Sequence, residues 1–153
     1  MSELKDRLRA DLTASIKGRE SLRASTLRMV LTVLTNAEVA GKSARELEND
    51  EVLGVIGSEA KKRREAAEAF DAGNRPELAA KEREEAKILA IYLPEQLSAE
   101  EIVSIVTEAV TTSAAAGAGM KAMGKVMGIV APRVKGRAEG GAVAAEVKRQ
   151  LGV

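Results

Sequence analysis

Apolar residues recur along this chain at intervals of three or four positions, which is the spacing that places them on one face of an α-helix. The first such stripe is formed by Leu4, Leu8, Leu12 and Ile16. Similar stripes continue to the C-terminus, and no segment shows the alternating pattern of a half-buried β-strand. Aromatic residues make up only 1% of the chain, so the core has to be aliphatic, and residues that favour helices are frequent. The sequence therefore predicts an all-α fold.

Glycine and proline divide this pattern into seven predicted helices. We expect Gly18, Gly41 and Gly73 to end the first three helices. Pro94 and Pro132 are expected to end the fourth and the sixth. The approximate ranges are 3–17, 19–40, 50–72, 76–93, 99–113, 120–131 and 142–151.

The sharpest helix start in the sequence is at Ser98. Ser98 and Glu101 fit a capping box, and the flanking Leu97 and Ile102 fit a hydrophobic staple. The balance of charge also changes here, because the part before Ser98 is nearly neutral and the part after it has an excess of basic residues. We therefore expect two domains: an N-terminal helical hairpin or bundle over residues 1–95 and a small three-helix domain over residues 96–153.

The sequence contains neither histidine nor cysteine, which excludes a Ser-His-Asp or Cys-His catalytic site and a zinc site built from these ligands. No Walker-type phosphate loop occurs, and the glycines at Gly117 and Gly119 do not complete a dinucleotide fingerprint. The densest carboxylate cluster, Glu82, Glu84 and Glu85, lies among basic residues, so we favour a salt-bridged helix surface over a magnesium site. We thus expect no catalytic residue, no metal and no cofactor.

Basic residues without an acidic neighbour are concentrated between Met120 and Ala138. Such a cluster suits contact with a phosphodiester backbone, because it is not neutralised locally and the flexible Gly136 lies between its last two members. The near absence of aromatic residues excludes base stacking, so the contacts would be to phosphate and ribose. An ordinary solvated loop explains the same pattern equally well. The candidate RNA-binding residues are Lys121, Lys125, Arg133, Lys135 and Arg137.

Three glycines are candidates for close approach of another molecule or helix. Gly124 and Gly128 lie four residues apart within a predicted helix, where each costs about 1 kcal/mol relative to alanine. Close packing of another helix would offset this cost, and we favour it over approach of an RNA backbone. Gly136 is the third candidate. A second basic run, residues 61–64, has glutamates at i,i+4 spacing, so there we favour an exposed helix surface over a nucleic-acid site.

Six short motifs stand out along the chain: 25–29 (STLRM), 36–38 (NAE), 62–65 (KRRE), 92–98 (YLPEQLS), 123–128 (MGKVMG) and 132–138 (PRVKGRA). None of them is specific by itself. In their order and spacing, however, they resemble the GatB/YqeY family along essentially the whole chain. The resemblance is greatest to the stand-alone YqeY-like proteins of that family.

This resemblance implies a two-part helical fold and kinship with the tail of the B subunit of the tRNA-dependent amidotransferase, where the tail helps to hold tRNA. Positions Gly124, Lys125, Gly128, Lys135 and Gly136 look like the motif shared with that tail. The family is associated with carbon–nitrogen ligase activity that uses glutamine as amido donor. This chain resembles only the tail, and the part of the B subunit that holds the catalytic site has no counterpart, so we do not transfer catalysis.

We therefore expect a non-catalytic helical module that binds tRNA, or an amidotransferase together with its tRNA. A protein-interaction module and a family-level ligase are the alternatives. The net charge of +1 means that RNA affinity has to come from local charge. No apolar run reaches membrane-spanning length and the first residues lack a secretory signal, so we expect a cytoplasmic protein without a membrane partner. The identity of the RNA, the protein partner and the oligomeric state are left open.

Overall fold

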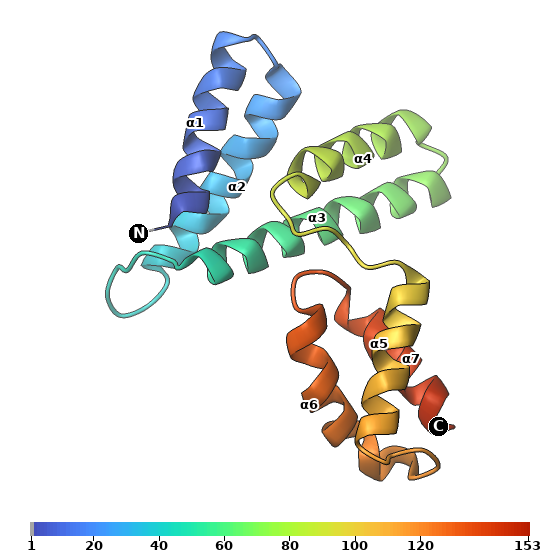
Figure 1. Cartoon of the computed structure of the whole chain (residues 1–153). Coiled ribbons are helices and arrows are strands. Elements are labelled where there is room, and N and C mark those ends of the chain that lie inside the picture. Colours follow the sequence, from blue (N-terminus) through green and yellow to red (C-terminus); the bar gives the residue numbers. More distant parts are fainter. Residues whose placement is uncertain (1) are drawn as a thin grey trace. The chain divides into compact units, whose positions relative to one another are not determined.

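The computed structural model describes residues 2–153, so Met1, the first residue of the predicted N-terminal domain, lies outside the described part of the chain (Figure 1). Residues 2–153 form seven α-helices and one short 3-10 helix, and no β-strand. The all-α prediction is therefore confirmed. No helix in this range combines the length and the apolar character needed to cross a bilayer. The chain divides into two compact units, Met1–Leu93 and Pro94–Val153, and the expected boundary after residue 95 lies two residues further along.

Two helical hairpins build the N-terminal unit, and Figure 1 shows each as a pair of adjacent antiparallel helices. The predicted stops at Gly18 and Gly73 are the C-caps of the first and third helices, and Pro76 opens the fourth. The fourth helix ends four residues before Pro94, earlier than expected. The helices are α1 (Glu3–Lys17), α2 (Ser21–Val39), α3 (Asn49–Ala72) and α4 (Pro76–Ala90).

The core of this unit is aliphatic apart from one aromatic ring. Tyr92 is buried, and its hydroxyl donates a hydrogen bond to Oδ2 of Asp11 over 2.5 Å. Burial and this carboxylate raise the pKa of Tyr92 to about 12. The largest fully buried side chains come from all four helices and include Leu8, Leu27, Leu34, Ile56 and Leu89.

The turn between α1 and α2 places a positive φ on a residue other than glycine. Gly18 is right-handed, and Arg19, which follows it, has a φ of 56°. The amide of Glu20 donates to the carbonyl oxygen of Ser15 over 2.9 Å and closes the turn. The glycine therefore lies one position before the left-handed residue. Ala114 in the C-terminal unit has a φ of 52° in an equivalent position.

The C-terminal unit consists of three α-helices that pack on one another around a valine-rich core. Its first helix starts at the predicted capping box. The hydroxyl of Ser98 accepts a hydrogen bond from the amide of Glu101 over 3.1 Å, and the amide of Ser98 donates to the Glu101 carboxylate over 2.8 Å. The elements are α5 (Ala99–Thr112), η1 (Gly119–Ala122), α6 (Met123–Val134) and α7 (Gly140–Leu151).

The prediction that Pro132 ends the sixth helix is wrong. Pro132 lies inside α6, which continues to Val134. Proline lacks the N–H that would bond to the carbonyl of Gly128, four residues earlier, but both residues are exposed, so water can satisfy that carbonyl. The final turn is closed by the amide of Lys135, which donates to Ala131 over 3.1 Å. The basic loop is therefore shorter than expected and begins at Lys135.

Candidate nucleic-acid interface

Helix α6 turns one side to the core and the other to solvent. Val126, Val130 and Val134 are buried at a spacing of four, and they fix which residues face outward. The outward side has no acidic residue, since none occurs between Met120 and Ala138. We call these exposed residues, with the adjacent lysine of η1, the α6 surface: Lys121, Gly124, Lys125 and Gly128.

The two glycines of the α6 surface have open space where a side chain would stand. A Cβ atom built on Gly124 or on Gly128 has no atom of another element within 4 Å. No helix of the described chain therefore packs closely against either glycine at its Cβ position, so the preferred explanation from the sequence finds no partner helix within residues 2–153. Two exposed glycines within one helix cost about 1 kcal/mol each, and no contact within the unit offsets that cost.

The lysines of the α6 surface differ in how they are held. Lys125 donates from Nζ to the carbonyl oxygen of Ser113 over 3.3 Å, at the C-terminal end of α5, where the helix dipole favours a positive charge. Lys121 is exposed and forms no ion pair with any residue in the range 2–153. Both charges are available to an incoming anion.

Arg133 is neutralised by a residue far away in the sequence. Its Nη1 lies 2.9 Å from Oε2 of Glu108 on α5. Sequence proximity indicated that no acidic residue neutralises the basic cluster, and it missed this pair because α5 and α6 come together only in the folded unit. Arg133 is consequently a weaker candidate for contact with phosphate than the two lysines of the α6 surface.

Arg137 lies half-buried against the segment that precedes α5. Its Nε donates to the carbonyl oxygen of Glu95 over 3.2 Å, and its own carbonyl accepts from the amide of Leu97 over 2.8 Å. Gln96 adds a side-chain bond to the carbonyl of Gly136 over 3.0 Å. These bonds connect the motif at residues 92–98 to the motif at residues 132–138. One of the five N–H donors of the Arg137 guanidinium is therefore directed at this segment.

Gly136 is required by the conformation of the loop. Its φ of 75° lies in the left-handed region, and an added Cβ would lie 4.0 Å from Cγ of Pro94. The close approach predicted for Gly136 thus has a neighbour within its own unit. Lys135, just before it, is exposed and has no ion pair within residues 2–153.

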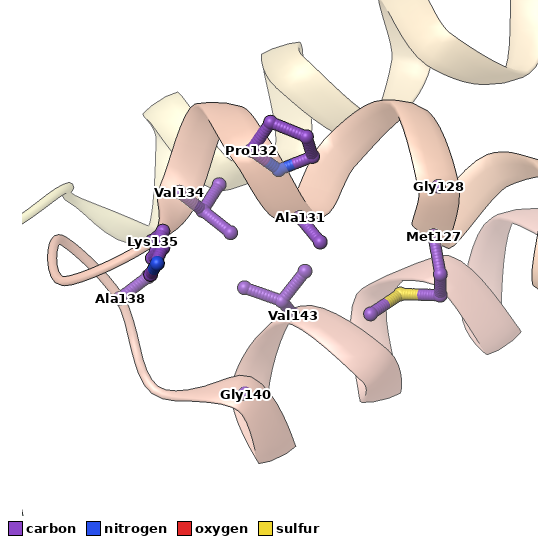
Figure 2. Close-up of a pocket in the computed structure, with 9 residues that line it drawn as sticks. All are labelled: Met127, Gly128, Ala131, Pro132, Val134, Lys135, Ala138, Gly140 and Val143. Carbon is purple, nitrogen blue, oxygen red and sulfur yellow. The ribbon is translucent and has the colours of Figure 1, made fainter. Parts of the chain in front are cut away.

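An open, mostly apolar groove of about 620 Å³ lies between α6 and α7. Figure 2 shows Met127 and Ala131 pointing from α6 toward α7, and Val143 pointing back from α7. Lys135 and Ala138 line the groove near the end where the loop joins the two helices. The groove is thus next to the basic loop and is built from side chains without titratable groups, apart from Lys135.

The predicted cations do not gather at one point. Lys121 and Lys125 lie at the N-terminal end of α6, and Arg133 and Lys135 lie at its C-terminal end. At 1.5 Å of rise per residue, Lys125 and Arg133 are about 12 Å apart along the helix axis. The candidate interface therefore places two pairs of basic residues along one carboxylate-free helix, and one of the four, Arg133, is paired with Glu108 of α5.

The basic run at residues 61–64 and the carboxylate cluster of α4, which the sequence offered as a nucleic-acid site and a magnesium site, both contain residues in ion pairs. Lys61 and Glu65 lie 3.9 Å apart, as their spacing predicts, and Glu84 pairs with Lys87 at 3.0 Å. The prediction that residues 61–64 form an exposed helix surface does not hold for Arg63. Its side chain is only 23% exposed and lies among carboxylates. Within residues 2–153 no group of three or more acidic side chains is arranged to hold a metal ion.

Comparison with known proteins provides two similarities. A family model described as "Yqey-like protein" matches residues 5–151, nearly the whole chain. A protein of Schizosaccharomyces pombe, itself described as uncharacterized, is 37% identical over 92 residues, which cover 60% of this chain and 72% of that protein.

Proposed function

This chain belongs to the YqeY-like family, and we propose that it is a non-catalytic helical module that binds tRNA, alone or within an amidotransferase complex, in the cytoplasm. The contact surface in this proposal is the α6 surface, extended by Lys135 and, more weakly, by Arg133 and Arg137. The kinship with an amidotransferase tail suggests the kind of RNA, and the geometry of α6 supports the place of contact.

One observation carries the proposal, namely two solvent-facing glycines between lysines on a helix without carboxylates. Gly124 and Gly128 carry no side chain, and no atom of another element lies within 4 Å of the place where a Cβ atom would stand. A bare helix backbone allows a phosphodiester strand to come closer than any side chain would permit. Lys121 and Lys125 then supply positive charge beside that strand.

The chemistry of this surface favours recognition of the backbone over recognition of bases. Lysine ammonium groups act as point charges toward phosphate oxygens, and no aromatic side chain is present in the C-terminal unit to stack on a base. Such contacts position an RNA and respond to its shape without reading its sequence. The proposal assigns no reaction to these residues, because the chain lacks the histidine and cysteine that nucleophilic sites use.

A titration of labelled tRNA, followed by fluorescence anisotropy at several salt concentrations, tests the proposal. The variant Lys121→Gln/Lys125→Gln should bind more weakly and reduce the salt dependence of the logarithm of the affinity by about 2, since each phosphate contact contributes about 1. The matched control, Lys61→Gln/Lys148→Gln, removes two lysines that are exposed elsewhere. Equal loss in both double variants would mean only non-specific attraction, and unchanged binding in the first would refute the proposed surface.

A protein partner is the second candidate, and the apolar groove between α6 and α7 favours it. A helix or an extended segment could bury Met127 and Ala131 without desolvating a charge. Affinity purification with and without nuclease separates the two candidates. A partner that stays bound after RNA digestion supports docking in the groove only if Ala131→Arg, which adds a charge to the groove, releases it.

A further inference from the structure

In the N-terminal unit, one guanidinium group lies among three carboxylates. Arg63 of α3 is 3.3 Å from Glu59 of the same helix, 3.5 Å from Glu82 of α4 and 3.7 Å from Glu85 of α4, measured between nitrogen and oxygen atoms. The side chains of the three glutamates are 5%, 16% and 13% exposed, in that order. The two hairpin helices are therefore joined by a largely buried group of charges.

The charges of this cluster do not balance. Helix α3 contributes Glu59, Arg63 and Lys62; the Lys62 side chain is 62% exposed, but its Nζ lies 2.8 Å from Oε1 of Glu59. From α4 it receives Glu82 and Glu85, with Lys81 acting on Glu85 from a greater distance. From α2 it receives only the neutral sulfur of Met29, which accepts a hydrogen bond from Nη2 of Arg63 over 3.5 Å. The cluster thus contains three acidic and two basic groups, and because Lys62 pairs with Glu59, Glu82 and Glu85 share the guanidinium group of Arg63.

The hydrogen bonds of the cluster are also incomplete. The distances from Arg63 to Glu82 and Glu85 exceed those of normal hydrogen bonds, and both Nε of Arg63 and Oε2 of Glu82 are buried without a hydrogen-bond partner. A buried carboxylate oxygen without a donor is costly. Burial, followed by the charge of Glu82, raises the pKa of Glu85 above its ordinary value. A proton on Glu85 would remove one of the negative charges around Arg63 and supply a hydrogen-bond donor.

We infer that the folded N-terminal unit holds a proton on Glu85, beside Glu82 and the shared guanidinium of Arg63, more tightly than the unfolded chain does, so that packing of α4 against α3 is coupled to proton uptake. The proton comes from solvent and forms a single O–H bond, and no other bond changes. The cluster acts as a pH-sensitive clamp between the two helices. Lower pH stabilises the packing of α4 against α3, and higher pH destabilises it. This inference does not depend on the proposed binding of tRNA.

Urea unfolding of the full chain at a series of pH values tests the clamp. Tyr92 is the only tyrosine and the chain has no tryptophan, so its fluorescence reports on the N-terminal unit. Because the pKa of Glu85 is raised in the folded state, the stabilisation is present below the ordinary value of 4.5 and is lost as the pH rises above it, so the urea midpoint of the wild type should fall over that range. Glu85→Gln, which imitates the protonated group, should abolish this fall and raise the midpoint at the high-pH end.

The control Glu84→Gln removes the same charge from the exposed side of α4, where Glu84 pairs with Lys87, and should leave the slope of the wild type unchanged. A Glu85→Gln slope equal to that of the wild type would overturn the inference. Carbon-13 NMR of the glutamate carboxyl groups in the wild-type chain tests it without relying on a variant that folds. One carboxyl group should titrate above the ordinary glutamate value of about 4.3, and its absence would equally overturn the inference.

Discussion

The amide of Leu97 donates to the carbonyl oxygen of Arg137 over 2.8 Å and joins the start of the C-terminal unit to the loop between α6 and α7. The side chains of Gln96 and Arg137 strengthen this connection from opposite directions, each donating to a backbone carbonyl of the other segment. The position of Lys135 and Gly136 therefore depends on Gln96 and Leu97, which carry no charge, and on the backbone and side chain of Arg137. Mutations of the basic loop have to be interpreted with this structural role in mind.

Gln96→Ala should loosen the basic loop without changing its charge. The substitution removes the side-chain bonds to the carbonyl oxygens of Gly136 and Pro94, which should destabilise the C-terminal unit by about 1 kcal/mol. Amide hydrogen exchange of Leu97 and Arg137 should become faster. Protection equal to the wild type at both amides would show that the side chain of Gln96 does not hold the loop.

Gly124→Ala and Gly128→Ala should each stabilise the C-terminal unit and yet weaken tRNA binding. Neither new methyl group has an atom of another element within 4 Å, and alanine gains about 1 kcal/mol over glycine within a helix. The methyl groups would, however, stand between α6 and an approaching backbone. Urea unfolding measures the first effect, and anisotropy measures the second.

Gly54→Ala is the matched control for these glycine variants. Gly54 lies within α3, is exposed and has nothing within 4 Å of an added Cβ. Its substitution should stabilise the N-terminal unit by a similar amount and leave tRNA binding unchanged. If Gly124→Ala and Gly128→Ala also leave binding unchanged, the bare backbone of α6 has no role in recognition.

Arg19→Gly should stabilise the N-terminal unit by about 1 kcal/mol. The φ of 56° at Arg19 is a left-handed conformation that glycine adopts at little cost, whereas a residue with a Cβ atom pays about 1–2 kcal/mol. Arg19 forms no ion pair within residues 2–153, so the loss of its charge should matter little. Thermal unfolding measures the change, and a lower midpoint for the variant would contradict this account of the turn.

Lowering the pH should destabilise the first turn of α3, because it breaks the ion pair between Arg45 and Glu51. The hydrogen bond from Arg45, followed by that from the amide of Glu48, lowers the pKa of Glu51 to about 2 from 4.5. Because the folded value is lowered, the stabilisation is present above pH 4.5 and is lost as the pH falls from there toward 2. Glu51→Gln should lose this part of the acid dependence, and hydrogen exchange in the first turn of α3 measures it. An identical acid profile in both proteins would show that the pair does not stabilise this turn.

Local sequence signals predicted those parts of the fold that depend on neighbouring residues. The capping box at Ser98 was predicted correctly because both of its members lie within one turn. The apolar stripe of the first helix was correct at Leu8, which is fully buried, but not at Ile16, which is 52% exposed. Pro132 was misinterpreted because a proline ends a helix only when the lost hydrogen bond cannot be replaced, and an exposed carbonyl at Gly128 can bind water.

Contacts between helices were beyond the reach of local signals. Nothing near Arg133 in the sequence indicates Glu108, and nothing near Arg63 indicates that Glu82 and Glu85 of the next helix meet it. The exposure of Gly124 and Gly128 depends on which side of α6 faces the core. That choice is set by the packing of Val126 and Val130 against the other helices, and a single glycine spacing contains no information about it.

The core of the C-terminal unit is built from seven valines, three alanines and one leucine. Valine is branched at Cβ and alanine has no rotatable side chain, so these side chains have few rotamers to lose when the unit folds. A sixty-residue unit has little apolar surface to bury, and a low entropic cost of ordering its core compensates for that modest area. Replacing Val126 by leucine or methionine would add apolar surface. It would also add side-chain rotamers, and folding would have to restrict them at a cost in conformational entropy.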